Sequence, residues 1–233
     1  MRAILLMLLF GLTAPARAET GRSVMRFDLR IVGFHAGILD LAATETDSAY
    51  AARSLFHTTG LLGALKRLRA DLSVQGRVTG GRLQPYDYAE AIDNGRRVTD
   101  LRVRFAPGIP RLISGDTGST APPADTRRLD AVIDPLTLLY LAVRDQPGDT
   151  LCRMTADIFD GHRHARFTLN GRQEQGKTIT CTGHYRRIAG YGGDAGKSDD
   201  VAISVDYVAN GSGWRAARLA VETWLGPAVL ERR

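Results

Sequence analysis

The sequence predicts a mainly β protein, built as a single strongly curved antiparallel sheet or incomplete β-barrel with two helices. Apolar side chains alternate with polar ones along most of the chain, as Phe27, Leu29 and Ile31 do among charged neighbours. A period of two residues is typical of a strand with one buried face. Glycine-containing turn pairs separate these runs. A short segment after residue 134 is apolar on nearly every side, so we expect it to pack against the sheet.

The expected strands are short and follow one another closely, which favours a curled sheet with antiparallel neighbours. In chain order they lie at about 26–31, 38–44, 48–58, 73–82, 85–92, 101–105, 153–159, 162–169, 177–188, 201–207, 214–223 and 227–232. The punctuating pairs combine glycine with Gly, Asn or Asp, and such pairs favour tight turns. They lie at 80–81, 94–95, 160–161, 170–171, 192–193 and 210–211.

Two segments have helical patterns. Leucines recur at helical spacing opposite basic residues over 60–71, which predicts an amphipathic helix there. The second helix is expected at about 135–144. Asp134 can cap its amino end, and Pro135 is well tolerated as the first helical residue. Apart from Thr137, the side chains that follow are almost all apolar, so this helix should be buried against the sheet.

The chain divides into a leader and one domain. Residues 1–18 combine Arg2, a short apolar stretch and the small-residue pattern at 16–18, which indicates a signal peptide for export. The apolar stretch is too short for a permanent membrane anchor. We therefore expect a periplasmic protein without a transmembrane anchor after cleavage. Residues 19–233 form a single β-rich domain, with a flexible loop at about 115–130 that is rich in Gly, Pro, Thr and Asp.

The formal net charge of +6 is modest, and basic runs with interleaved aromatic residues are missing from the sequence. We therefore expect no nucleic-acid partner.

Two cysteines, Cys152 and Cys181, would enter an oxidising compartment where disulfides form. A two-residue hairpin at 160–161 would place Cys152 opposite about Leu169 and leave Cys181 on a third strand. In a flat sheet, that separation exceeds the roughly 7 Å between Cα atoms that a disulfide spans. A bend before Arg153 or a strongly curled sheet would bring the pair together. A disulfide and two buried or idle thiols both remain open.

Several landmarks occur in a characteristic order. They are the segments at 33–37, 83–88, 134–140, 159–163 and 185–191. Their order and spacing resemble the exported bacterial family named domain of unknown function 3108, over nearly all of the mature chain. The segments at 134–140 and 159–163 are the most specific. The resemblance implies a periplasmic, mostly antiparallel β protein with no established activity, and it implies no catalytic residues.

Histidines provide the one candidate metal site. His162 and His164 alternate on one expected strand, and the register places His184 near His162 on the next strand. Three imidazoles could bind zinc or copper. Neighbouring arginines oppose a cation, so a solvated polar face is favoured. The G-x-S-x-G pattern of serine hydrolases is missing as well. We therefore expect no catalytic, cofactor or metal residues, and a metal-dependent or hydrolytic enzyme is the less favoured alternative.

A binding role follows from the expected shape, because a curved sheet partly closed by an apolar helix tends to leave a concave apolar surface. We expect Leu136, Leu139 and strand aliphatics to line it, and a lipid-like or amphipathic small molecule of the envelope to bind there. Rim arginines would then meet phosphate or carboxylate groups. The candidates are Arg26, Arg30, Arg102 and Arg104. The alternatives are help with envelope assembly, or a structural or protein-interaction factor with a sealed core that uses its sheet edge or the 115–130 loop to contact envelope proteins.

Overall fold

The computed structural model describes residues 21–60, 63, 67–105, 109–192, 199–224 and 226–233. In this part of the chain, thirteen strands form one antiparallel sheet that does not close. The strands are β1 (Gly21–Ile31), β2 (Phe34–Glu45), β3 (Ala49–Thr58), β4 (Arg69–Thr79), β5 (Arg82–Asp93), β6 (Val98–Arg104), β7 (Arg111–Gly115), β8 (Met154–Phe159), β9 (His164–Gln175), β10 (Thr178–Ala189), β11 (Asp200–Asn210), β12 (Gly213–Thr223) and β13 (Gly226–Arg232). The α-helix α2 (Pro135–Val143) and the 3₁₀ turn η1 (Thr126–Arg128) lie between β7 and β8. The predicted fold class is confirmed.

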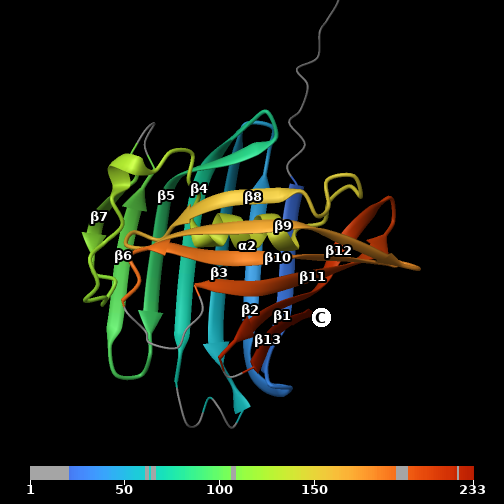
Figure 1. The fold of residues 1–233 in the computed structure, drawn as a ribbon, viewed down its shortest axis with the longest axis horizontal. Helices are drawn as coiled ribbons and strands as arrows, with labels where there is room; N and C mark the ends of the chain where they lie inside the picture. The colour runs from blue at the N-terminus through green and yellow to red at the C-terminus, as the bar shows by residue number, and fades with distance from the viewer. Residues whose placement is uncertain (1–20, 61–62, 64–66, 106–108, 193–198, 225) are drawn as a thin grey trace, which may run out of the picture.

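The sheet is assembled from two runs of hairpins. The strand order is β7-β6-β5-β4-β3-β2-β1-β13-β12-β11-β10-β9-β8, so the chain returns after α2 and joins its last strand to its first. Leu29 of β1 faces Leu230 of β13 at this junction. Figure 1 shows the result: β8–β11 cross in front of the first strands, and α2 lies between the two layers. One sheet therefore covers the helix from two sides.

The start of α2 forms as the sequence predicts. The Oδ1 atom of Asp134 accepts hydrogen bonds from the backbone N–H groups of Leu136 and Thr137, both at 2.9 Å. Pro135 occupies the first turn, where its missing N–H is not needed. Leu136 is 0% exposed, and Asp134 and Thr137 are equally buried. The helix is thus buried in the core, which confirms its predicted packing against the sheet.

Polar contacts fix one face of α2 against β2 and β3. The hydroxyl groups of Thr137 and Tyr50 lie 2.7 Å apart. Tyr140 donates a hydrogen bond of 3.0 Å to Glu45, which also pairs with Arg144 at 2.8 Å. Thr137, Tyr140 and Arg144 follow the spacing of one helical face. The few polar side chains of this segment are therefore used to orient it.

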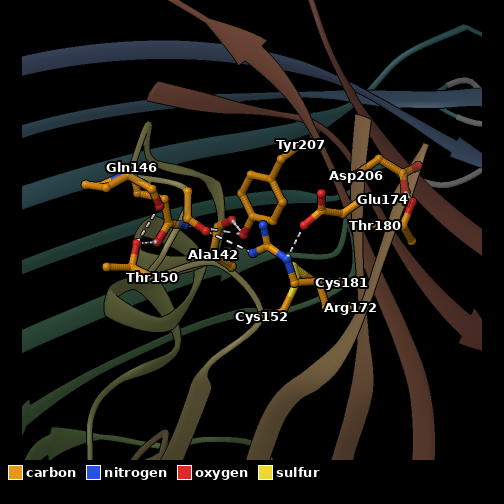
Figure 2. Close-up of a disulfide and its surroundings, with 12 residues drawn as sticks. Ala142, Gln146, Thr150, Cys152, Arg172, Glu174, Thr180, Cys181, Asp206 and Tyr207 are labelled. Carbon is orange, nitrogen blue, oxygen red and sulfur yellow. Dashed lines mark hydrogen bonds and ion pairs between the residues drawn. A yellow bond between two sulfur atoms is a disulfide. The ribbon is translucent and has the colours of Figure 1, made fainter. Parts of the chain in front are cut away.

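Strands β11 and β12 hold the carboxyl end of α2 through its backbone groups. Tyr207 of β11 donates a hydrogen bond of 2.7 Å to the carbonyl of Ala142 (Figure 2). Just after the helix, Gln146 and Trp214 exchange two backbone hydrogen bonds of 3.0 Å each. These contacts attach the chain leaving α2 to β11 and β12.

A disulfide joins Cys152 to Cys181, with 5.0 Å between their Cα atoms (Figure 2). It connects the segment after α2 to β10, and Cys181 is completely buried. Of the two possibilities that the sequence leaves open, the disulfide is therefore correct. Cys152 has a φ of 60° and lies before β8, so it is part of the bend that the pairing requires.

The predicted register of β8 and β9 was wrong by two residues. Phe159 pairs with His164, so the connection is a four-residue turn, 160–163, rather than a two-residue hairpin. The side chain of Asp160 accepts hydrogen bonds from the backbone of His162, at 2.9 Å, and of Arg163, at 2.6 Å. A capping aspartate of this kind stabilises a wider turn. As a consequence Met154, rather than Cys152, lies opposite Leu169.

The expected turn at 170–171 was also wrong, because both residues lie inside β9. Gly171 pairs with Thr182 and Leu169 pairs with Gly183, which leaves Asn170 as the extra residue of a β-bulge. A Cβ atom on Gly171 would approach the Thr182 hydroxyl too closely. This glycine therefore permits a bulge instead of a turn.

The remaining differences from the sequence prediction concern the first predicted helix, an edge strand, the long loop and the signal peptide. The centre of the predicted helix at 60–71 falls outside the described residues, at 61–62 and 64–66, and its end was wrong, since residues from Arg69 onward pair with β3 and β5 as β4. The edge strand β7 was not predicted. Residues 116–130 carry no regular element except η1. The expected signal peptide at 1–18 lies outside the described residues.

Among the described residues, none of the helices has the length and apolar character needed to cross a bilayer.

Titration of Asp134 gives the first testable prediction. Complete burial raises its pKa to about 6, although hydrogen bonds from Thr137 and Leu136 oppose this shift. An unfolded chain has an Asp pKa of about 3.9. The folded state therefore binds the proton of Asp134 more tightly than the unfolded state does. The stabilisation that this proton gives is lost as pH rises from about 4 to about 6. The free energy of unfolding of the wild type minus that of Asp134→Asn should fall across this window, by at most about 1.4 kcal/mol per pH unit.

Chemical denaturation at pH 4, 5, 6 and 7 measures this difference. Contributions shared by both proteins cancel, including that of Asp28, whose pKa Arg233 lowers to about 2. A difference that stays constant with pH would show that Asp134 keeps its ordinary pKa.

The disulfide gives a second prediction. The crosslink closes a sequence separation of 29 residues. Chain entropy then predicts that Cys152→Ala/Cys181→Ala unfolds with a free energy lower by about 3–4 kcal/mol. Denaturant titration measures it, with circular dichroism confirming that the double variant keeps its β structure. Equal stability of the two proteins would contradict this structural role.

Candidate ligand-binding cavity

A cavity of about 880 Å³ lies between α2 and the inner faces of β9–β12. This volume is within the range of small-molecule binding sites, which is about 300–1,000 Å³. Most of the residues that line it are apolar. The strands contribute Phe167, Val201, Ile203, Leu219 and Val221. Val201 and Ile203 of β11, like Leu219 and Val221 of β12, are separated by one position, which is the alternation that turns them to the same face of the sheet.

The helix contributes its second face to the cavity. Pro135, Leu138, Leu139 and Ala142 line it, at the spacing that places residues on one side of a helix. Pro135 and the two leucines are only half-buried, in contrast to the sealed face that contacts β2 and β3. Leu139 was predicted at this position. Leu136, which was also predicted to line the cavity, is instead enclosed in the core.

Charged and aromatic groups form one part of the lining, which we call the entrance. Arg187, Asp200 and Glu222 line the cavity together with Trp224, whose side chain is 76% exposed. Asp200 is paired with Arg186 at 3.1 Å and with a histidine at 3.2 Å. The site therefore has an apolar interior and a charged entrance, which suits a ligand with two different ends.

Two tyrosines lie beside Arg187. The hydroxyl groups of Tyr185 and Tyr191 are 2.9 Å apart, and the guanidinium of Arg187 lies 5.2 Å from the centre of the Tyr191 ring. Burial raises the pKa of both phenols, so both are neutral at physiological pH. A neutral ring carries negative charge on its face and attracts the guanidinium.

The three histidines of the predicted metal site do not converge. His184 pairs with Thr168 in the register of β9 and β10, and its ring contacts Asp200. His164 lies 3.3 Å from Asp157, and His162 is buried in the turn before β9. The prediction failed because β9 continues through 170–171 and turns only after Gln175, which places His184 beside Thr168. The described residues contain no group of three or more ligating side chains suited to a metal ion.

The predicted rim arginines also lie elsewhere. They occupy positions that alternate with the buried residues of β1 and β6, so they face away from the core. Arg26 pairs with Asp40 at 2.6 Å, and Arg30 pairs with Glu231 at 2.8 Å. Arg102 and Arg104 both approach Asp87, at 3.6 and 3.8 Å.

Sequence reasoning missed Arg187, although a signal for it exists. Tyr185 and Arg187 alternate with the outward residues His184 and Arg186 along β10. Continuing the alternation from the buried Cys181 would have placed Arg187 on the inner face.

Comparison with known proteins places the fold among β-barrel-like proteins without assigned function. The crystal structure of a β-barrel-like protein of domain of unknown function DUF1849 from Brucella abortus is similar, with a TM-score of 0.51 and 9% sequence identity. The similarity covers 93% of this chain and 96% of that one, and it concerns the fold alone. A search of curated proteins found no match. The sequence model of the family described as "Protein of unknown function (DUF3108)" matches residues 25–212. The chain therefore belongs to the DUF3108 family.

Proposed function

We propose that this protein is an exported, non-enzymatic binding protein of the periplasm, which takes an apolar or amphipathic envelope ligand into the cavity beside α2. The observation that carries the proposal is the cavity of about 880 Å³ with its apolar helix and strand walls. When a ligand buries apolar surface of the cavity, the free energy of binding becomes more favourable by about 25 cal/mol for each Å² removed from water. The half-buried leucines of α2 provide such surface.

Two observations support export. The first 18 residues have the composition of a signal peptide. The disulfide between Cys152 and Cys181 is typical of proteins in oxidising compartments. In the bacterial envelope, the abundant apolar ligands are lipids and their acyl chains, so we take a lipid-like molecule as the ligand. Assistance in envelope assembly would follow if the protein transfers such a molecule.

A second candidate function is protein interaction through the sheet edge. All five residues of β7 are exposed, and they include Leu112 and Ile113. A sheet edge can accept an added strand from another protein. This observation favours a structural or interaction factor that contacts envelope proteins.

Substitution in the cavity separates the two functions. Leu139 lines the cavity, whereas Leu141 is a half-buried leucine of the same helix that does not. We expect Leu139→Gln to weaken the binding of the apolar fluorophore N-phenyl-1-naphthylamine about tenfold. An amide in an apolar wall costs about 1–3 kcal/mol, and a tenfold change in Kd corresponds to about 1.4 kcal/mol. Leu141→Gln should bind as the wild type does.

Fluorescence titration gives the three dissociation constants, and thermal unfolding confirms that both variants are folded. Lipids that co-purify with the mature protein from its native envelope are then identified by mass spectrometry. Lack of fluorophore binding by the folded wild type, together with no lipid above background, would leave the sheet-edge function as the better account.

A further inference from the structure

We infer that the cavity takes an amphiphile with an anionic head, a carboxylate or a phosphate, which Arg187 binds at the entrance while the apolar chain lies along α2. This inference rests on the proposed binding function and specifies its ligand class. It depends on the position of Arg187, on its lack of an ion pair with any described residue, and on the way the aromatic neighbours hold it.

Arg187 differs from the other half-buried arginines of the described chain. Those four arginines all form ion pairs with carboxylates. They are Arg30 with Glu231, Arg144 with Glu45 and Arg232 with Asp145, each at 2.8 Å, and Arg218 with Asp206 at 3.4 Å. Arg187 forms no ion pair with any carboxylate in the part of the chain that the structure describes. A half-buried guanidinium is partly removed from water, so an anion from outside the chain gains more here than at an exposed arginine.

The guanidinium is also held in place, and none of the described residues accepts a hydrogen bond from it. Its central carbon lies over the Tyr191 ring, 5.2 Å from the ring centre, and the hydroxyl of Tyr185 anchors that ring. The N–H groups of an arginine lie in its plane and match the two oxygens of a carboxylate or phosphate. Arg163 lies 5.7 Å from the centre of the same ring, but its charge is already paired with Asp160 at 3.7 Å, which leaves Arg187 as the cation for a ligand. A stacked arginine of this kind is preorganised for an anion.

The acidic groups at the entrance do not cancel this preference. Asp200 is already compensated by Arg186 and His184. Glu222 belongs to β12, whereas Arg187 belongs to β10, and β11 separates these two strands in the sheet. An anionic head would therefore be bound on the β10 side of the entrance, away from Glu222. The exposed indole of Trp224 provides an optical probe at the same opening.

The test compares three ligands with the same chain and different heads: hexadecanoate, hexadecyl phosphate and hexadecanol. Each displaces N-phenyl-1-naphthylamine from the full mature protein, and the fluorescence of Trp224, measured in protein that carries Trp214→Phe, gives a second readout. We expect the wild type to bind at least one of the anions about tenfold more tightly than the alcohol. Arg187→Gln should lose this preference and keep its affinity for the alcohol. Arg187→Lys should retain part of the preference, because it keeps the charge without the planar fork.

Arg153→Gln is the matched control, since Arg153 is an exposed arginine that does not line the cavity. It should keep the full preference for the anions. Tighter binding of the phosphate would identify a phospholipid head as the source, and tighter binding of the carboxylate a free fatty acid. Equal affinity of the wild type for the alcohol and both anions would overturn the inference while leaving the proposed function intact. Binding of none of the three ligands would count against the proposed function itself.

Discussion

Helix α2 is apolar on nearly every side, so exposing any of its faces to water would cost free energy. This constraint organises the fold. Its polar side chains, Thr137 and Tyr140, both bind groups of the sheet instead of solvent. Apolar surface on every side requires cover on every side. The sheet meets this requirement by passing behind the helix as β1–β4 and returning in front of it as β8–β11 (Figure 1). Contacts from Tyr207 and the disulfide then attach the second half of the chain to the segment that leaves the helix.

The same constraint explains why a cavity exists where it does. One helical face binds the hydroxyl of Tyr50 and the carboxylate of Glu45, and its residues Thr137 and Tyr140 are buried against the sheet. The other face turns two half-buried leucines toward β9–β12, and the protein itself does not fill the space between them. A ligand that completes this apolar contact would stabilise the folded state through its own binding energy. The proposed role of Arg187 places the polar end of such a ligand at the entrance.

Sequence patterns predicted the parts of this structure that depend on local chemistry. Alternation of side chains located most strands, and Asp134 with Pro135 located α2, because caps and periodicity act over a few residues. The register between strands could not be read in the same way. Asp160 widens its turn by binding the backbone of the next residues, which shifted the pairing of β8 with β9 by two positions. Strand β9 continues through 170–171 and turns only after Gln175, so His184 pairs with Thr168 instead of lying near His162. Alternation along β10 could have placed Arg187 on the inner face, but the cavity that it lines combines several strands and depends on their register.

Methyl-resolved NMR tests the central claim most directly, since it reports each face of α2 separately. The full mature protein, with labelled leucine methyl groups, is titrated with hexadecanoate. The account predicts large shifts and contacts to the ligand chain for Leu138 and Leu139, which line the cavity. Leu136, which is enclosed on the sealed face, should change little. Shifts of equal size on both faces of the helix, or no shifts at saturating ligand, would contradict the account.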